Sequence, residues 1–261
     1  MEHSQSISVL VSARRNSKYL AKFLFGFFER TADWRNMEIL VMLNEHDDWN
    51  RELVDFFMPF GVRFFHENEQ LGRAGLHEYF NKLYLPATGA WIVYFCEDHF
   101  ITKDGWDREI RSMIKGWRGD GDTVGKKFPL DPNEPWVLVP KFDNVGAMNH
   151  VLSHGFIKAL GNKLGRHGWI DSYINDLAAV MPDRVIRFDE PFFHDFTHDQ
   201  PNPMSEAHVQ SVSTKKGEAL PDYKDPIVQK RIKEDQQKLI RAIKTRHPKL
   251  KIPEAKNGLP E

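Results

Sequence analysis

Residues 91–100 read Trp-Ile-Val-Tyr-Phe-Cys-Glu-Asp-His-Phe, an apolar run that ends in the polar residues Glu97, Asp98 and His99. An uninterrupted apolar run of this length predicts a strand buried on both faces, as in a parallel sheet covered by helices. Open α/β sheets bind ligands at the carboxyl ends of their strands, where these three side chains would lie. Carboxylates and an imidazole together suit a divalent cation. The residues alone leave two interpretations open, a metal site and a solvated polar turn.

Short apolar segments alternate with helical ones over the first hundred residues. We expect strands at 7–12, 37–43, 62–65 and 91–96, and helices from 17 onward, at 49–58 and at 72–84. Strands that alternate with amphipathic helices indicate βαβ units. The sequence therefore predicts an α/β fold with a doubly wound, mostly parallel sheet and helices on both faces.

The second half of the chain is less regular. We expect strands at 136–140 and 185–188, helices at 106–117, 149–161 and 168–180, and a loop from 191 to 198. The composition then becomes polar and rich in proline, and a charged helix follows at 224–245.

Composition excludes some classes of function. Lysine and arginine number 36 against 37 acidic residues, so the chain has no general field that would attract nucleic acid. The one cysteine, Cys96, has no partner for an internal disulfide, which fits a reducing compartment. We see neither a secretory signal nor an apolar segment of the ~20 residues that span a bilayer, and expect a cytoplasmic protein.

Several motifs of well-known enzymes are missing. The chain contains no GxGxxG, no GxxxxGK[ST], no HExxH and no GxSxG. Candidate acid–base and ligand groups are Asp171 and Asp176 in a predicted helix, and His194, Asp195 and His198 after a strand. Asp171 and Asp176 lie about 140° apart around a helix, so we expect one of them at most to face a site. Solvated aspartates and two polar loop histidines are the alternative interpretations.

Five motifs occur in the same order as in a known family. Residues 7–16 read ISVLVSARRN, and an acidic loop follows the apolar run at 37–43. Asn81 precedes ATGAWIVYF at 87–95, and Trp106 and the segment at 168–176 follow. The series resembles the GT-A glycosyltransferases, especially the family 2-like group, over about residues 6–198. The residues at 96–99 then stand where the family carries its acidic DxD metal motif.

The resemblance implies transfer of a sugar from a nucleotide-sugar donor, with a divalent cation and with inversion at the sugar. It implies that Asp98 holds the metal with Glu97 or His99, that His194 or His198 closes the site, and that Asp176 or Asp171 is the base. It also implies a set of nucleotide-sugar contacts: Ala13, Arg14, Glu45, Asp47, Arg73, Asn81 and Glu97.

The expected elements and the resemblance together predict one large domain with a C-terminal extension. The domain covers residues 1–200, and the resemblance divides it into a nucleotide-sugar half at 1–105 and an acceptor half at 106–200. A linker and charged helix follow at 201–247, and a flexible tail at 248–261.

The chain departs from the family pattern at several positions. Ser12 and Ala13 replace the usual Pro-Thr, and Cys96 and His99 stand where Asp is commoner. A histidine ligand favours Mn²⁺ over Mg²⁺. We expect a UDP- or GDP-linked sugar as donor and a glycan, a lipid-linked molecule or another hydroxyl compound as acceptor.

Two alternatives remain from the sequence. The first is a catalytically silent GT-A domain that binds a nucleotide sugar or glycan as an interaction module. The second concerns the charged helix at 224–245, which could rest on an anionic membrane surface. Its modest apolar face favours packing on the core instead.

Overall fold

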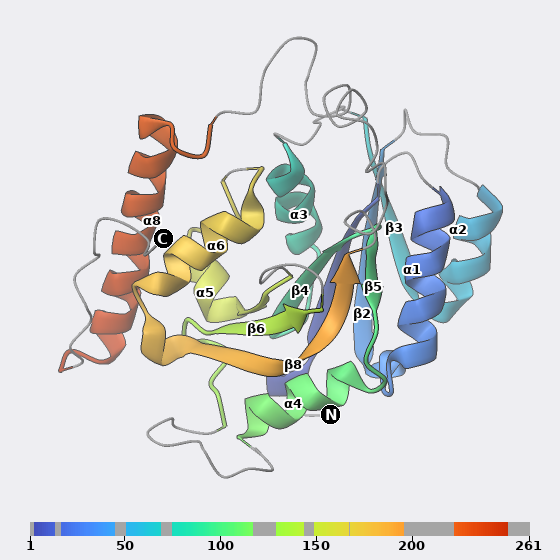
Figure 1. Ribbon diagram of the computed structural model, residues 1–261, viewed down its shortest axis with the longest axis horizontal. Helices are drawn as coiled ribbons and strands as arrows, with labels where there is room; N and C mark the ends of the chain where they lie inside the picture. The colour runs from blue at the N-terminus through green and yellow to red at the C-terminus, as the bar shows by residue number, and fades with distance from the viewer. Residues whose placement is uncertain are drawn as a thin grey trace.

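One eight-stranded sheet forms the centre of the computed structural model (Figure 1). The strand order is β3-β2-β1-β4-β7-β6-β8-β5. The structure describes residues 3–13, 17–44, 51–68, 75–116, 129–143, 149–166, 168–195 and 222–249. The predicted linker before residue 222 and the predicted tail after residue 249 lie outside these ranges. The strands are β1 (Ile7–Ala13), β2 (Met37–Asn44), β3 (Val62–Glu67), β4 (Trp91–Cys96), β5 (His99–Ile101), β6 (Val137–Phe142), β7 (Val151–Ser153) and β8 (Val185–Asp195).

The sheet is mostly parallel, as the sequence predicted. β1 pairs in parallel with β2 and β4, β2 with β3, and β6 with β8. β7 runs antiparallel to β4 and β6, and β5 runs antiparallel to β8. The helices are α1 (Ser17–Arg30), α2 (Arg51–Phe57), α3 (Leu76–Tyr84), α4 (Trp106–Lys115), α5 (His154–Ala159), α6 (Ile170–Ala179) and α8 (Pro226–Arg246), with short 3₁₀ turns at His3–Gln5, Trp34–Asn36, Met58–Phe60 and Pro182–Arg184.

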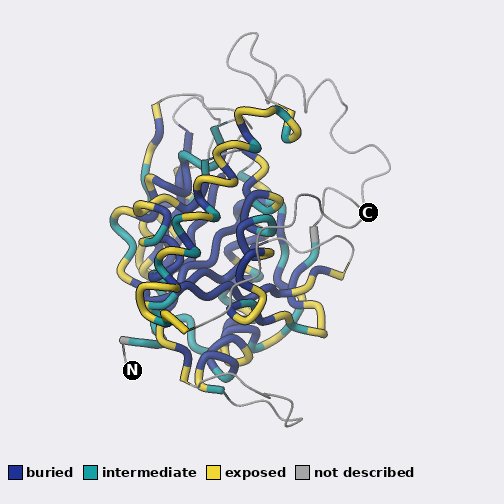
Figure 2. Tube along the Cα trace, turned by 90° about the vertical axis from the view of Figure 1, so that its left-hand side faces the viewer, coloured by how far each residue is buried: buried dark blue, intermediate teal, exposed yellow. Residues whose placement is uncertain are grey.

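Helices cover both faces of the sheet, and each face has its own apolar core. Alternate residues of β4 divide between the two: Val93 and Phe95 pack with α1, α2 and α4, whereas Ile92 and Tyr94 pack with α3, α5 and α6. The strand is buried over nearly its whole length, because side chains point alternately to two covered faces. Figure 2 shows the resulting buried centre, with exposed residues on the outer turns.

The register brings several strand ends to one edge of the sheet. Ser12 of β1 lies opposite Cys96 of β4, and Glu97 N–H donates to the Ser12 carbonyl at 3.3 Å. Gly89, just before β4, lies very close to the backbone of β1. A Cβ at this position would lie 2.4 Å from the Ser8 backbone nitrogen. This close approach explains the glycine and fixes the alignment of the two strands.

Hydrogen bonds join the start of α4 to the loop after α1. Trp106 is fully buried and its indole N–H donates to Thr31 Oγ1 at 2.9 Å. The buried Asp107 carboxylate accepts the backbone N–H groups of Ala32 and Asp33 at 2.9 and 3.0 Å. These bonds satisfy a buried charge at a turn that has no strand partners.

The C-terminal helix α8 packs on α5 and α6 rather than standing apart (Figure 1). Its apolar residues Val228, Ile232, Leu239 and Ile243 are buried in the core. The fully buried Asp235 accepts the Tyr173 hydroxyl at 2.5 Å and pairs with Lys238 and Arg166.

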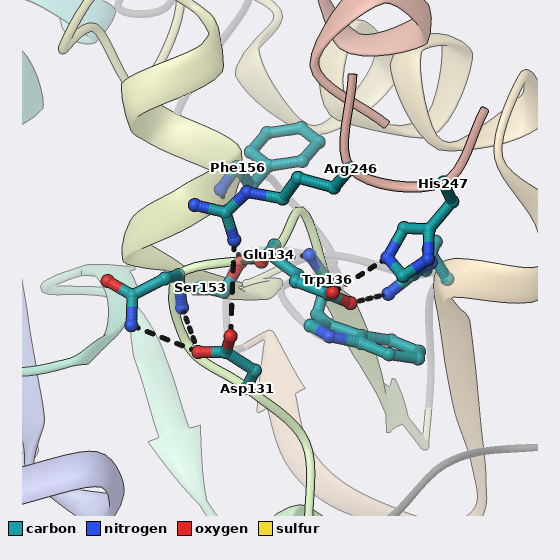
Figure 3. A network of polar contacts seen from close by, with 9 residues as sticks. Asp131, Glu134, Trp136, Ser153, Phe156, Arg246 and His247 are labelled. Atoms are coloured by element: carbon teal, nitrogen blue, oxygen red, sulfur yellow. Dashed lines mark hydrogen bonds and ion pairs between the residues drawn. The ribbon is translucent and has the colours of Figure 1, made fainter. Parts of the chain in front are cut away.

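Polar contacts at the end of α8 complete its attachment (Figure 3). His247 Nε2 lies 2.7 Å from Glu134, which also pairs with Arg184, and Arg246 lies 4.0 Å from Asp131. Burial opposes ionisation of Glu134, but the hydrogen bonds from Arg184 and His247 outweigh it and lower the pKa of that carboxyl. The packing that the sequence favoured for this helix is therefore present. No helix in the described part of the chain is long and apolar enough to cross a membrane.

Two predicted segments were wrong. The region expected as a helix at 149–161 begins with strand β7 and continues as the shorter α5. The region expected as a loop after Pro191 continues β8 as far as Asp195. Pro191 pairs with Lys141 of β6, and the register between β6 and β8 is irregular on both sides of this pair. Proline lacks the backbone N–H that regular strand pairing requires, and such an irregular position tolerates its absence.

Candidate functional site

Three potential cation ligands converge at the end of β4. Cys96, Asp98 and His99 each offer one ligand atom, and these atoms lie within 4.8 Å of one another. Asp98 Oδ1 lies 3.7 Å from His99 Nε2, and it is buried without a hydrogen-bond partner in the described structure. An unsatisfied buried carboxylate oxygen is costly. The donor set therefore fits a divalent cation, which would satisfy that oxygen.

His99 is held in place from its other nitrogen. The side-chain amide of Asn149 lies 2.8 Å from Nδ1, and the Cys96 N–H reaches the same atom at 3.3 Å. The imidazole ring meets the Phe142 ring edge-on at 5.5 Å between centroids. Since His99 is only 4% exposed, these contacts keep its Nε2 on the side of Asp98.

Asp171, at the start of α6, belongs to a polar network beside these ligands. Its Oδ1 accepts the Tyr94 hydroxyl at 2.7 Å and the Asn149 backbone N–H at 3.3 Å. The Tyr94 hydroxyl also lies 2.9 Å from His150 Nδ1, and His150 Nε2 lies 3.0 Å from Asn175 Oδ1. Asn149 thus contacts both Asp171 and His99, which joins the candidate base to the candidate ligands.

Burial determines the charge of this network. It raises the pKa of Tyr94 well above its usual value, with a further rise from the Asp171 carboxylate. Burial also lowers the pKa of His150, against the opposing pull of Asp171. Tyr94 therefore stays a hydrogen-bond donor to Asp171.

The structure does not bring Asp176 into this network. Its Oδ2 accepts the Tyr223 hydroxyl at 2.5 Å, and its backbone carbonyl accepts the Gln236 amide of α8. The two aspartates of α6 thus bind groups on different elements, as their spacing predicts. We retain Asp171 in the candidate site; a catalytic role for Asp176 remains a sequence-based prediction.

His194 lies on β8, not in the predicted loop. Its Nδ1 is 2.6 Å from Asp143 Oδ1. The β5–β8 register pairs His194 with Phe100, so its side chain lies on the strand face opposite to that of His99. The structure therefore does not gather His194 with Asp98 and His99, and its role as a ligand remains a prediction.

Three predicted donor-binding residues lie in well-packed positions. Asn81 is 8% exposed; its Oδ1 accepts the Leu164 N–H at 2.7 Å and its Nδ2 donates to the Gly165 carbonyl at 3.0 Å. These hydrogen bonds join α3 to the loop that contains Leu164 and Gly165. Ala13, the last residue of β1, and Glu97, which follows β4, are each 8% exposed and lie next in the chain to the paired residues Ser12 and Cys96.

The remaining predicted site residues lie outside the described part of the chain: Arg14, Glu45, Asp47, Arg73 and His198. Their roles stay predictions. Sequence reasoning also missed Tyr94, Asn149, His150 and Asn175 as members of the site. Tyr94 carried the one available signal, since it is a hydroxyl-bearing side chain in the otherwise apolar run of β4.

The fold is one that glycosyltransferases share. No family model matches the sequence, and no curated protein matches it. Among solved structures, the mannosyltransferase PcManGT from Pyrobaculum calidifontis, in complex with GDP-Man and Mn²⁺, matches with a TM-score of 0.55 and 13% identity. The match covers 94% of this chain and 76% of that one.

S. aureus TarS is a second solved protein whose fold is similar to that of this chain. Its 1–349 fragment in complex with UDP matches with a TM-score of 0.55 and 12% identity over 74% of this chain. The match spans 62% of that fragment's length. The same fragment with UDP-GlcNAc matches with a TM-score of 0.52 over 92% of this chain and 80% of that one. At such low identities these similarities show the fold alone.

Proposed function

We propose that this protein is a glycosyltransferase that uses a nucleotide sugar and a divalent cation. The observation that carries the proposal is the unsatisfied Asp98 Oδ1 beside His99 and Cys96, at the end of a central strand. Solved structures with this fold include complexes with UDP, with UDP-GlcNAc, and with GDP-Man and Mn²⁺, which supports the choice of ligand class. A sheet of this kind binds its ligands at the carboxyl edge, where these residues lie.

Asp98 and His99 are the residues we assign to the cation. A bound Mn²⁺ or Mg²⁺ would act as a Lewis acid that neutralises the diphosphate leaving group. The protein's own contribution is to present Asp98 Oδ1 and His99 Nε2 on the same side, which the Asn149 contact to Nδ1 secures.

Asp171 is the residue we assign as general base. Its Oδ1 is occupied by Tyr94 and Asn149, while within the described residues its Oδ2 has no protein partner. Two donors to one oxygen fix the carboxylate plane and leave the other oxygen to accept a proton. In an inverting displacement Asp171 takes the acceptor hydroxyl proton, the acceptor oxygen bonds to the anomeric carbon, and the nucleoside diphosphate departs with the bonding electrons.

Measurement of donor turnover tests the proposal. UDP-GlcNAc and GDP-Man would be incubated with the protein and Mn²⁺, and the release of UDP or GDP followed with and without a panel of hydroxyl acceptors. Asp171→Asn should reduce the rate by about 10²–10⁴-fold, which is the usual contribution of a general base. Asp98→Asn should remove the dependence on Mn²⁺. The control is Asp55→Asn on α2, whose side chain is 65% exposed.

Turnover that is unchanged in both Asp98→Asn and Asp171→Asn would contradict the assignments. Donor binding without any turnover would favour the second candidate, a silent binding module. The observation behind that alternative is the presence of Cys96 and His99 where the resembling family more often carries aspartate.

A further inference from the structure

We infer that Cys96 is a third cation ligand and that the site therefore selects a thiophilic divalent cation, such as Zn²⁺ or Co²⁺, over Mg²⁺. The inference rests on the proposed position of the site and names the chemistry of its cation. Sulfur, nitrogen and carboxylate donors together suit Zn²⁺ and Co²⁺, whereas Mg²⁺ prefers oxygen donors alone.

The geometry brings the three donors within reach of one ion. Their ligand atoms lie within 4.8 Å of one another. Donor atoms around a tetrahedral Zn²⁺ lie about 3.5 Å apart, as follows from metal–ligand distances of about 2.0–2.3 Å. Rotations of the partly exposed Cys96 and Asp98 side chains can supply the difference, while His99 is the fixed member.

Asn149 contacts Nδ1 of His99, the ring nitrogen other than the Nε2 that lies near Asp98. Asn149 is 1% exposed, adopts a left-handed conformation with φ of 50°, and has a side-chain Oδ1 that is buried without a partner in the described part of the chain. A half-turn of its amide would place that oxygen at Nδ1 of His99, where the amide nitrogen now lies at 2.8 Å, and would leave the amide nitrogen as the atom without a partner.

The half-turn determines which nitrogen of His99 carries the proton. With the amide oxygen at Nδ1, the imidazole donates its proton there, and Nε2 presents a lone pair toward Asp98. Histidine ligands of metals usually donate their second N–H in this way. A proton on Nδ1 would break the hydrogen bond from the Cys96 N–H to that atom, which at 3.3 Å is longer than the 2.8 Å contact with the Asn149 amide.

Three protein ligands leave room for a further one. Catalytic zinc sites commonly have three protein ligands and one open position, whereas structural sites are closed by four. An open position at the end of β4 is where the diphosphate of a nucleotide sugar would bind. The thiophilic donor set and the proposed activity are therefore compatible.

The sole cysteine makes the inference directly testable by spectroscopy. Co²⁺ would be titrated into the full, untagged, reduced chain, and the absorption recorded in the near ultraviolet and visible. We expect one equivalent of Co²⁺ to bind with a thiolate-to-cobalt charge-transfer band. Because the chain has one cysteine, such a band could come only from Cys96. Zn²⁺ should abolish the band at stoichiometric amounts, and a large excess of Mg²⁺ should not.

Variants assign each donor. Cys96→Ser should lose the charge-transfer band and keep weaker Co²⁺ binding, and Asp98→Asn should weaken binding further. Asn149→Ala should weaken binding by about 10–100-fold, as expected for a group that orients a ligand. Asp55→Asn should bind Co²⁺ as the parent does, and thermal melts would show which variants are folded.

Binding of Co²⁺ without a charge-transfer band, or Mg²⁺ displacing Co²⁺ at comparable concentration, would overturn the inference. Neither result would bear on sugar transfer, because the titration contains no nucleotide sugar. Conversely, a charge-transfer band in a chain that turns over no donor would support the cation site and count against the proposed activity. The two proposals can therefore fail separately.

Discussion

Tyr94 links the apolar core to the candidate site. Its ring is buried among core residues of α3, while its hydroxyl reaches Asp171 at 2.7 Å and His150 at 2.9 Å. A phenylalanine would keep the ring packing and lose both polar contacts. A substitution at Tyr94 can therefore test the polar contacts of β4 without changing its packing in the core.

We predict that Tyr94→Phe lowers the free energy of unfolding by about 1–3 kcal/mol, because it leaves buried polar partners unsatisfied. Urea unfolding monitored by circular dichroism would measure the change. The same variant should reduce donor turnover, since Asp171 loses its shorter hydrogen bond. A stability equal to that of the parent would contradict the predicted cost of losing the two contacts, and unchanged turnover would show that the Tyr94 contact does not position Asp171.

The candidate site could be predicted from the sequence only in part. The resemblance to the GT-A pattern identified Asp98, His99 and Asp171 as candidates. Asn149 and His150 could not be found in this way, because their contacts with residues 94, 99 and 171 span large separations in the chain and leave no periodic pattern.

At the scale of elements, Gly89 shows how one residue aligns two strands. A Cβ at this position would meet the backbone nitrogen of Ser8 at 2.4 Å and the Ile7 carbonyl carbon at 2.9 Å. Backbone atoms of a central strand cannot move aside cheaply. Gly26 in α1 offers a matched control, because a Cβ added there would have nothing within 4 Å among the described residues.

We predict opposite effects for the two alanine substitutions. Gly89→Ala should destabilise the protein by about 1–3 kcal/mol through overpacking. Gly26→Ala should stabilise it by about 0.5–1 kcal/mol, because alanine is the better helix former. Thermal or urea unfolding of both variants would check this. Equal effects of the two substitutions would contradict the close approach of β1 and the turn before β4.

Long apolar strands were predictable, and short antiparallel ones were not. β1, β2 and β4 agree with the expected ranges to within a residue, because buried parallel strands are continuous apolar runs. β5 and β7 have three residues each, too few for any periodicity to appear. These segments are strands because they pair with neighbouring strands of the folded sheet, β5 with β8 and β7 with β4 and β6.

At the scale of the whole molecule, buried tyrosines link stability to pH. Burial raises the pKa of Tyr84 to about 12, and its hydroxyl lies 2.9 Å from His154 Nδ1. A raised pKa means that the folded state favours the neutral phenol. The associated stability is therefore complete below pH 10, the unfolded value, and is lost as the pH rises toward 12.

We predict that Tyr84→Phe weakens this pH dependence. Urea unfolding at several pH values from 8 to about 12 would give the difference in stability between the parent and the variant. The parent should lose its advantage over the variant as the pH rises above 10. Two parallel stability curves across that range would contradict the prediction.

The fold as a whole followed from the pattern of the first hundred residues, and the chain has the α/β fold of glycosyltransferases. The donor and the acceptor did not follow, because they depend on pocket side chains that no pattern in the sequence specifies. Our main proposal for the molecule is that the end of β4 binds a nucleotide sugar together with a divalent cation.

A thermal-shift screen is the sharpest test of this proposal. UDP-, GDP-, CDP- and dTDP-linked sugars would be tested with Mn²⁺ and with a chelator, on the parent and on Asp98→Asn. A ligand at 100 times its dissociation constant stabilises the fold by about 2.7 kcal/mol, which is readily measured. We expect at least one nucleotide sugar to stabilise the parent with Mn²⁺, and the chelator or Asp98→Asn to remove the effect. Stabilisation by none of the sugars, or equal stabilisation of Asp98→Asn with the chelator present, would contradict the proposal.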